Sequence, residues 1–464
     1  MTKHDSYKKV SGSFRDPSGF LFTINGVLYR QINEVYKDNY DFLMESGLYS
    51  LLVDEGLLIQ HKEVDVNKEK NELAYKIIKP KQIPFISYPY EWCFSQLKEA
   101  ALLTLDIQRK ALEFGMSLKD CSGYNVQFKC GRPIFIDTLS FEKYVNGRPW
   151  IAYRQFCQHF LATLALMATK DVRINQILRV FIDGLPLDLT SQLLDFSSRF
   201  NFSLLTHIHL HNKSQKHFSG KSLSNKNKIN FSISSLKGMI DSLFNAVKKM
   251  DYKINKTVWS DYYEESNYTV ESMKAKMDIV SRFLDKTEPS VVWDLGANTG
   301  NFSQICDQKG IFVVSIDSDP LTTEKNYLRC LNNNEINILP LTIDLANPSA
   351  SIGWGHRERF SMEERGPADT IMALALIHHL SIANNIPFDK IAKYFKKICR
   401  YLIIEFVPKS DSQVQKLLSS RVDIFSDYNH AAFENVFEKY YSIKEKVKVI
   451  KSERTLYLME KLNN

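Results

Sequence analysis

The stretch Val291-Val-Trp-Asp-Leu-Gly-Ala-Asn-Thr-Gly300 decides the fold of the second half of this chain. Its first five residues are mostly apolar and end before a glycine, which predicts a short buried parallel strand that closes in a tight turn. Gly296 and Gly300 carry no side chains where a ligand must lie against the backbone. A helix predicted from Asn301 onward turns its free N–H groups toward the same place. The pattern therefore predicts a ligand-binding turn between a strand and a helix.

Two further apolar runs end in acids at the places that a nucleotide-binding fold requires. Residues 311–316 predict a second strand that ends at Asp317, about 20 residues past the glycines, where Rossmann-type folds grip a ribose. Residues 336–343 predict a third strand, which ends at Asp344. The glycine spacing is not G-x-G-x-x-G, so a dinucleotide site is disfavoured.

The order strand, D-x-G-x-x-x-G turn, helix, strand, acid resembles the class I S-adenosylmethionine (SAM) methyltransferases. The resemblance implies that the first loop cradles the amino-acid part of SAM, that Asp317 holds the ribose hydroxyls and that Asp344 contacts the adenine amino group. The residues that it places at the cofactor are Asp294, Gly296, Asn298, Gly300, Asp317 and Asp344. A non-binding α/β turn of similar appearance is the alternative, and the later order of elements argues against it.

The fourth and fifth predicted strands carry the candidates for catalysis. Residues 369–379 form an apolar run that ends at His378 and His379, and the resemblance implies that this end faces the transferred methyl group. An imidazole there could accept a proton from a hydroxyl, although either histidine could instead pack against the following helix. Residues 400–407 predict strand five, with Glu405 near its active edge as a catalytic or substrate contact; a salt-bridged structural group is the alternative.

The remaining elements of this half complete the same pattern. Residues 346–366 predict a long polar loop after strand three, at the edge where open α/β sheets bind ligands. Two alternating runs, 440–450 and 454–460, resemble the antiparallel last strand of methyltransferase sheets. Residues 259–464 are therefore predicted to form an α/β domain, a Rossmann-like seven-stranded methyltransferase sheet with an antiparallel last strand and no metal site.

A second motif lies in the first half of the chain. Asp120, Asn125 and Asp137 have spacings that resemble the catalytic segment of the protein-kinase-like superfamily, which includes aminoglycoside phosphotransferases. The preceding hairpin, helix, strands and long helix resemble its small lobe and hinge. The resemblance implies an ATP and Mg site at these residues, with Arg30 where a strand lysine would reach the phosphates.

The departures from that superfamily are specific. Leu118 and Lys119 replace the usual His-Arg or His-Gly before the aspartate, and no glycine-rich phosphate loop is evident. Arginine is not interchangeable with lysine as a point donor. We therefore expect residues 1–212 to form an α+β kinase-like domain that binds or scaffolds and is catalytically degenerate. The alternative is a turn that Asp120 and Asn125 organise for structural reasons.

Bulk composition narrows the class of protein. A hydrophobic fraction of 44% with 24% charged residues is globular, and no apolar run is long enough to span a bilayer. The seven cysteines form no C-x-x-C pair, which predicts reduced thiols and a cytoplasmic protein. The formal charge of +7 lies partly in the lysine-rich stretch 213–228, so it does not predict nucleic acid as a partner. Residues 213–258 are predicted to be a basic linker and an amphipathic helix.

The two-part layout, with Ile377-His-His379 and Glu405-Phe-Val-Pro-Lys-Ser-Asp411, resembles bacterial methyltransferases of the nodulation-protein NoeA type. That resemblance implies a saccharide or related small molecule as substrate. The predicted function is SAM-dependent O-methylation, and the alternatives are a bifunctional kinase-methyltransferase that uses ATP and a scaffold of two inactive folds. The sequence predicts neither the acceptor atom nor the oligomeric state.

Overall fold

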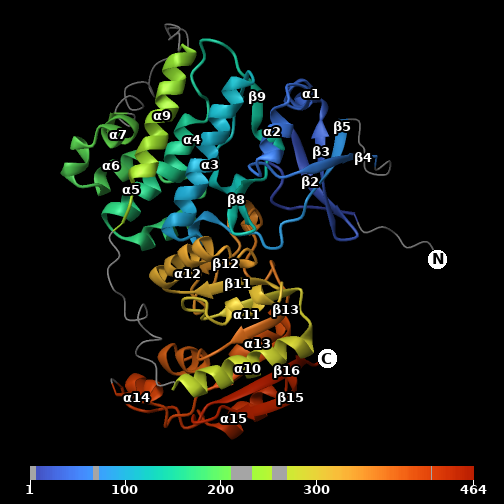
Figure 1. Cartoon of the computed structure of the whole chain (residues 1–464), viewed down its shortest axis with the longest axis vertical. Coiled ribbons are helices and arrows are strands. Elements are labelled where there is room, and N and C mark those ends of the chain that lie inside the picture. Colours follow the sequence, from blue (N-terminus) through green and yellow to red (C-terminus); the bar gives the residue numbers. More distant parts are fainter. Residues whose placement is uncertain (1–6, 66–72, 211–231, 253–268, 420, 464) are drawn as a thin grey trace. The chain divides into compact units, whose positions relative to one another are not determined.

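The computed structural model describes residues 7–65, 73–210, 232–252, 269–419 and 421–463 (Figure 1). The chain divides into two compact units: Met1–Lys253 with Ser351–Arg359 form unit 1, and Ile254–Ala350 with Phe360–Asn464 form unit 2. The predicted basic linker, 213–228, lies outside the described residues. The amphipathic helix predicted after it is confirmed as α9 (Ile233–Lys249).

Unit 1 begins with an antiparallel sheet in the order β1-β2-β3-β5-β4. Its strands are β1 (Tyr7–Lys9), β2 (Gly19–Ile24), β3 (Val27–Asn33), β4 (His61–Val64) and β5 (Ala74–Pro80). The turn between β2 and β3 falls at Asn25 and Gly26, both with positive φ, as the Asn-Gly hairpin signal predicts. Between β3 and β4 lie α1 (Lys37–Glu45) and α2 (Leu48–Asp54).

The rest of unit 1 is mainly helical. Its long helix is α3 (Phe94–Glu113), and two small two-stranded sheets follow, β6 (Met116–Leu118) with β9 (Phe141–Lys143) and β7 (Val126–Lys129) with β8 (Arg132–Phe135). The later helices are α4 (Tyr153–Phe156), α5 (Ala162–Thr169), α6 (Leu187–Leu193) and α7 (Phe202–Leu204). The β7–β8 hairpin places residues 120–125 before it and Asp137 after it.

Unit 2 contains a seven-stranded sheet in the order β12-β11-β10-β13-β14-β16-β15. Its strands are β10 (Val291–Leu295), β11 (Phe312–Asp317), β12 (Ile338–Thr342), β13 (Ala368–Ala373), β14 (Cys399–Phe406), β15 (Tyr441–Lys448) and β16 (Thr455–Lys461). Strands β10 to β14 run parallel, and β16 is antiparallel to β14 and to β15. The predicted sheet and its antiparallel last strand are confirmed.

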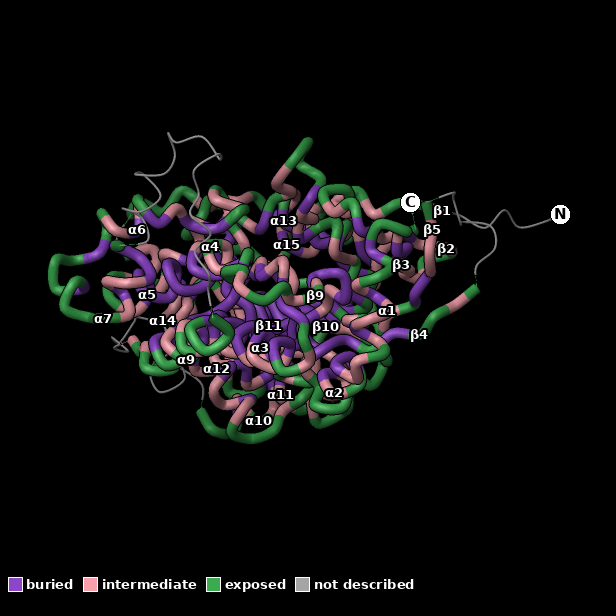
Figure 2. Tube along the Cα trace, turned by 90° about the horizontal axis from the view of Figure 1, so that it is seen from above, coloured by how far each residue is buried: buried purple, intermediate pink, exposed green. Residues whose placement is uncertain are grey.

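The sheet order fixes where unit 2 can bind a ligand. Successive crossovers run from β10 to β11 and β12, and the chain then returns to place β13 on the other side of β10. The crossover helices therefore diverge at the carboxyl ends of β10 and β13, which is the topological switch point where open α/β sheets form a crevice. Figure 2 shows β10 and β11 as buried strands.

The helices of unit 2 bury an apolar face against this sheet. They are α10 (Val270–Thr287), α11 (Ser303–Gln308), α12 (Pro320–Asn333), α13 (Phe388–Ile398), α14 (Ser412–Leu418) and α15 (His430–Phe437). Helix α10 contributes Val280, Phe283 and Leu284 to the core that contains Val292 of β10. The spacing of these residues follows the helical period, so residue 276 lies on the same buried face.

Three further features of the described residues concern membrane spans, the loop after β12 and the backbone just before β13. None of the helices that the structure describes is both long and apolar enough to cross a membrane. The loop after β12 divides between the units: its two ends, 346–350 and 360–366, belong to unit 2, whereas its middle part, Ser351–Arg359, belongs to unit 1. A cis peptide bond joins Gly366 and Pro367 just before β13.

Candidate active site

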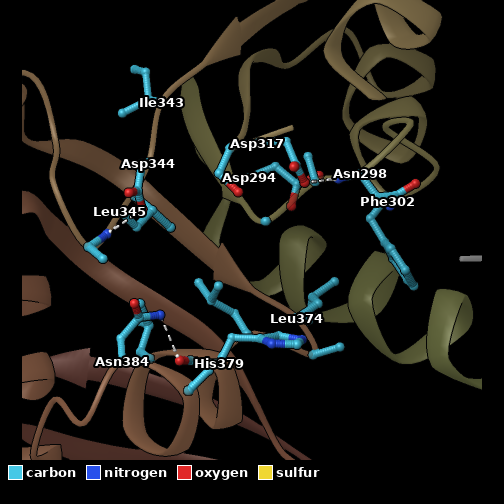
Figure 3. Close-up of a pocket in the computed structure, with 18 of the residues that line it drawn as sticks. Asp294, Asn298, Phe302, Asp317, Ile343, Asp344, Leu345, Leu374, His379 and Asn384 are labelled. Atoms are coloured by element: carbon cyan, nitrogen blue, oxygen red, sulfur yellow. Dashed lines mark hydrogen bonds between the residues drawn. The ribbon is translucent and has the colours of Figure 1, made fainter. Parts of the chain in front are cut away.

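A cavity of about 260 Å³ lies at the carboxyl ends of the parallel strands of unit 2 (Figure 3). Five of the six predicted cofactor residues line it, namely Asp294, Gly296, Asn298, Asp317 and Asp344. These residues lie at or just after the carboxyl ends of three strands that are neighbours in the sheet, β10, β11 and β12. Of the predicted catalytic residues, His379 lines the cavity, whereas His378 and Glu405 lie behind its wall.

The glycine turn takes the conformation that its residues allow. Gly296, Asn298 and Gly300 all have positive φ, a region that glycine and asparagine tolerate best. The backbone N–H groups of Gly296 and Ala297 both donate to the carbonyl oxygen of Ile316 at 2.9 Å, which ties the turn to β11. This turn therefore presents backbone to the cavity in a fixed shape.

The absence of a side chain at Gly296 and at Gly300 makes room for different neighbours. A Cβ atom on Gly296 would come 3.2 Å from the side chain of Leu376, another residue of the cavity wall. A Cβ atom on Gly300 would come 2.6 Å from the side chain of Asn326 in α12, and Gly300 is not part of the wall. Gly300 thus allows α12 to approach the turn, which is a packing role.

Two buried carboxylates lie beside this turn, as Figure 3 shows. The Ser303 hydroxyl donates to Asp294 Oδ2 at 2.7 Å, and burial raises the pKa of Asp294 to about 6. The two oxygens of Asp317 accept hydrogen bonds from the backbone N–H groups of Asn298 (2.8 Å) and Asp319 (2.9 Å). Burial also raises the pKa of Asp317, although these hydrogen bonds oppose the shift.

The third carboxylate stands at the other side of the cavity. Asp344 Oδ1 accepts a hydrogen bond from the backbone N–H of Ala346 at 2.8 Å, which closes a turn directly after β12. Ile343 and Leu345 flank it, and both line the cavity. The wall here combines an acceptor with apolar side chains, an arrangement that suits the edge and the faces of a heteroaromatic ring.

Lys276 of α10 is a cavity residue that the sequence interpretation missed. Its Nζ donates to Glu405 Oε2 at 2.7 Å, and the side chains of both residues are at most 2% exposed. The same carboxylate oxygen accepts the backbone N–H of Ala375, also at 2.7 Å. Lys276 and Ala375 line the cavity, so Glu405 supports two parts of the wall from behind. The signal in the sequence was a lysine at an apolar position of a helix.

Glu405 also stabilises an uncommon backbone conformation. Ala375 has φ of +50°, in the left-handed region that non-glycine residues rarely adopt. It lies just after β13, between Leu374 and Leu376, and all three residues are part of the wall. Because the Glu405 carboxylate accepts the Ala375 N–H, it holds the end of β13 in the shape that the cavity requires.

The two histidines after β13 differ in their surroundings. His379 lines the cavity, and burial lowers its pKa to about 4, with a smaller contribution from the charge of Arg454. His378 is fully buried, its ring centroid lies 4.1 Å from that of His379, and neither of its ring nitrogens has a hydrogen-bond partner among the described residues. Burial lowers the pKa of His378 as well, so both imidazoles are neutral at neutral pH.

The four residues predicted from the kinase-like pattern lie together in unit 1. Arg30 Nη1 is 2.5 Å from Asp137 Oδ1, and that oxygen also accepts the N–H of Leu139. Burial raises the pKa of Asp120, and the nearby charge of Asp137 adds to the shift. The Asn125 side chain opposes this shift in the pKa of Asp120, and its Nδ2 donates to the Ser140 hydroxyl at 3.1 Å. Arg30 therefore neutralises the carboxylate for which a metal ion was predicted.

The sheet order and the cavity define a Rossmann-like α/β fold of the kind that class I methyltransferases share. The chain is 33% identical over 466 residues to nodulation protein NoeA of Rhizobium meliloti (strain 1021), and the match covers 98% of this chain and 96% of that protein. The chain therefore belongs to the same family as NoeA. A scan against protein-family models finds no match.

Solved structures with some similarity to this chain include three methyltransferases. Magnesium protoporphyrin IX methyltransferase from Synechocystis PCC 6803, with bound SAH, is 16% identical with a TM-score of 0.32 over 44% of this chain and 93% of that one. The N-methyltransferase NodS from Bradyrhizobium japonicum WM9 is 11% identical with a TM-score of 0.30 over 41% and 96%. The bifunctional kinase-methyltransferase WbdD is 15% identical with a TM-score of 0.30 over 43% and 41%.

Proposed function

We propose that unit 2 is a SAM-dependent methyltransferase that modifies a hydroxyl group of a saccharide or another small molecule. The observation that carries this proposal is the position of Asp294, Asp317 and Asp344. These carboxylates lie at or just after the carboxyl ends of adjoining strands and line one cavity at the switch point of the sheet. A strand-end acid of this kind is suited to the hydroxyl groups of a nucleoside.

The polar groups of the cavity fit the parts of SAM. A carboxylate can accept about four hydrogen bonds, so Asp317 has capacity for a ribose hydroxyl beyond its backbone partners. Asp344, between two apolar side chains, would accept from the adenine amino group. Asp294 and Lys276 supply a carboxylate and a cation to the part of the wall beside the glycine turn, where the amino-acid portion would lie.

The rest of the reaction needs alignment and a proton acceptor. SAM supplies an activated methyl group, so holding the acceptor in line accounts for much of the rate. His379 is neutral and lines the cavity, and it would take the proton of the acceptor hydroxyl at a ring nitrogen. Glu405 acts on this chemistry through Lys276 and Ala375, and we therefore assign it a positioning role.

Titration calorimetry with SAM tests this function. Micromolar binding corresponds to about −8 kcal/mol, and Asp317→Ala should weaken it at least tenfold. Asp369→Ala is the matched control, since that acid accepts hydrogen bonds from the backbone N–H groups of Ser290 and Val291 at the opposite end of β10. Failure of the wild-type chain to bind SAM would remove the proposal.

Mass spectrometry of extracts incubated with methyl-labelled SAM would identify the acceptor.

A kinase-like fold is our proposal for unit 1. The antiparallel sheet with two helices between its third and fourth strands, followed by α3, supports it, as does the grouping of Asp120, Asn125 and Asp137. The Arg30–Asp137 ion pair favours a degenerate site, because the guanidinium takes the place of a metal ion at that carboxylate. ATP turnover with Mg that is lost in Asp137→Ala would instead support the bifunctional alternative.

A further inference from the structure

A nine-residue segment, Ser351–Arg359, lies between β12 and β13 in the sequence but belongs to unit 1. It is a closed loop: Ile352 and Arg359 exchange backbone hydrogen bonds at 3.1 and 3.2 Å, and the N–H of Glu358 also donates to the carbonyl oxygen of Ile352. Its tip, Trp354–His356, is exposed. We call residues 351–359 the docking segment.

The strongest polar contact of the docking segment is an ion pair. Arg15 donates from Nε (3.0 Å) and Nη2 (2.8 Å) to Glu358 Oε1, and the Glu358 side chain is only 1% exposed. Burial alone would raise the pKa of Glu358, but the Arg15 hydrogen bonds and charge outweigh it, so the pKa is lowered. A buried carboxylate held in this way depends on its partner, because removing the arginine takes away its hydrogen-bonded counter-charge.

The β1–β2 loop that carries Arg15 fits the backbone of the docking segment closely. A Cβ atom on Gly12 would lie 2.4 Å from the carbonyl oxygen of Glu358, so only glycine permits this approach. The Ser11 hydroxyl donates to the carbonyl oxygen of Arg357 at 2.9 Å. Three residues of one loop therefore contact two consecutive residues of the docking segment.

The other side of the docking segment contacts aromatic residues of unit 1. The Arg359 guanidinium lies 3.9 Å from the ring centroid of Tyr124, within the turn that joins Asp120 to Asn125. Ile352 packs against the cluster of Tyr88, Tyr90 and Leu178. The docking segment is therefore held by an ion pair, a cation–π contact and apolar packing, whereas an ordinary surface loop makes few such contacts.

The residues on either side of the docking segment, among them Ser349 and Met362, belong to unit 2. We call them the stem of the loop, and they follow cavity residues in the chain. The N–H of Met362 donates to the carbonyl oxygen of Ser349 at 2.9 Å, which closes the stem. Asp344, Leu345 and Ala346, all part of the cavity wall, come a few residues earlier in the chain. The wall and the docking segment therefore share one short stretch of backbone, and fixing one end restricts the other.

We propose that seating of the docking segment against Arg15 and Tyr124 fixes the Asp344–Ala346 wall, which makes Arg15 a positioning residue for SAM binding. This inference rests on the proposed methyltransferase function. It gives unit 1 a role in the reaction that needs no phosphoryl transfer: unit 1 holds a segment of the same chain whose backbone continues into the cofactor cavity.

Charge reversal tests the inference on the full chain. Arg15→Glu should raise hydrogen exchange at the amides of Ile352 and Glu358 at least tenfold and weaken SAM binding at least fivefold in calorimetry. The swap Arg15→Glu with Glu358→Arg should restore most of both, since the pair is re-formed with opposite polarity. Arg148→Glu, at an exposed arginine of unit 1, is the control and should change neither.

The two readouts separate the possible failures. Faster exchange with unchanged SAM affinity would show that the segment docks without holding the wall, and the inference would be overturned. Unchanged exchange in Arg15→Glu would overturn the docking itself. If the wild-type chain binds no SAM, the proposed function fails and takes the positioning role with it, while the exchange data still report whether Arg15 holds the segment.

Discussion

The buried ion pair between Lys276 and Glu405 gives the most demanding prediction. Both side chains are at most 2% exposed and their charged atoms are 2.7 Å apart. Glu405→Ala leaves the Lys276 ammonium buried without its carboxylate, which costs about 3–5 kcal/mol for pairs of this kind. It also removes the acceptor of the Ala375 N–H. Domain stabilities are about 5–15 kcal/mol, so unit 2 should lose a large part of its stability.

A double-mutant cycle measures the coupling free energy between the charges of Lys276 and Glu405. Lys276→Met leaves the carboxylate without its cation, whereas Lys276→Met combined with Glu405→Leu removes both charges and leaves the Ala375 N–H without its acceptor. The double variant should therefore be more stable than the sum of the single effects predicts, by at least about 2 kcal/mol. Glu363→Ala, which breaks the exposed pair with Lys397, should cost no more than about 1 kcal/mol.

Urea unfolding followed by circular dichroism, with separate transitions fitted for the two units, is the measurement. The change belongs to the transition of unit 2, which contains both residues. A cost below about 1 kcal/mol for Glu405→Ala, or strictly additive single and double variants, would refute the reasoning. SAM affinity measured on the same variants would then show whether the wall changes shape when its support is removed.

Two further predictions concern the glycine turn and the histidine. Gly300→Ala should lower the stability of unit 2 by about 2 kcal/mol or more in the same assay, because the new Cβ would lie 2.6 Å from the buried Asn326 side chain. Gly310→Ala is the control: Gly310 also has a positive φ but no atom within 4 Å of a Cβ, so the cost should be only about 1 kcal/mol. His379→Gln should lower the methylation rate by about 10²-fold or more. At saturating SAM, where protonation of Asp294 (pKa about 6) does not limit cofactor binding, the wild-type rate should stay level from neutral pH down to about 5 and fall below that, because neutral imidazole is the proton acceptor and its pKa is about 4. A rate that already halves near the ordinary histidine pKa under these conditions would contradict the assignment.

The sheet and its acids could be predicted because their information is local. Strands β10, β11 and β12 are short apolar runs, and Asp294, Asp317 and Asp344 lie at or just after their carboxyl ends. Parallel strands bring their carboxyl ends to one edge, so spacing along the chain was enough to group the three residues. The hairpin at Asn25 and Gly26 was predictable for the same reason.

The groups that the sequence did not reveal depend on contacts between distant segments. Lys276 is separated from Glu405 by more than a hundred residues, and nothing near either residue indicates the pairing. Glu405 was placed at the active edge, yet the Ala375 N–H and Lys276 hold it behind the wall. The loop after β12 has a polar composition typical of a solvent-facing loop, and only the position of Arg15 explains why Glu358 is buried.

The place of β16 between β14 and β15 has a consequence for biosynthesis. Until residues 455–461 have been made, β14 keeps an open edge with unpaired N–H and C=O groups, which is a known hazard for aggregation. At about 5–20 residues per second, the roughly 170 residues from Val291 to Lys461 take roughly 10–30 s to synthesise. A ribosome that stalls after Phe406 would therefore prolong the lifetime of an aggregation-prone intermediate with an open β14 edge. Synonymous codon changes in that part of the mRNA should alter the yield of native protein.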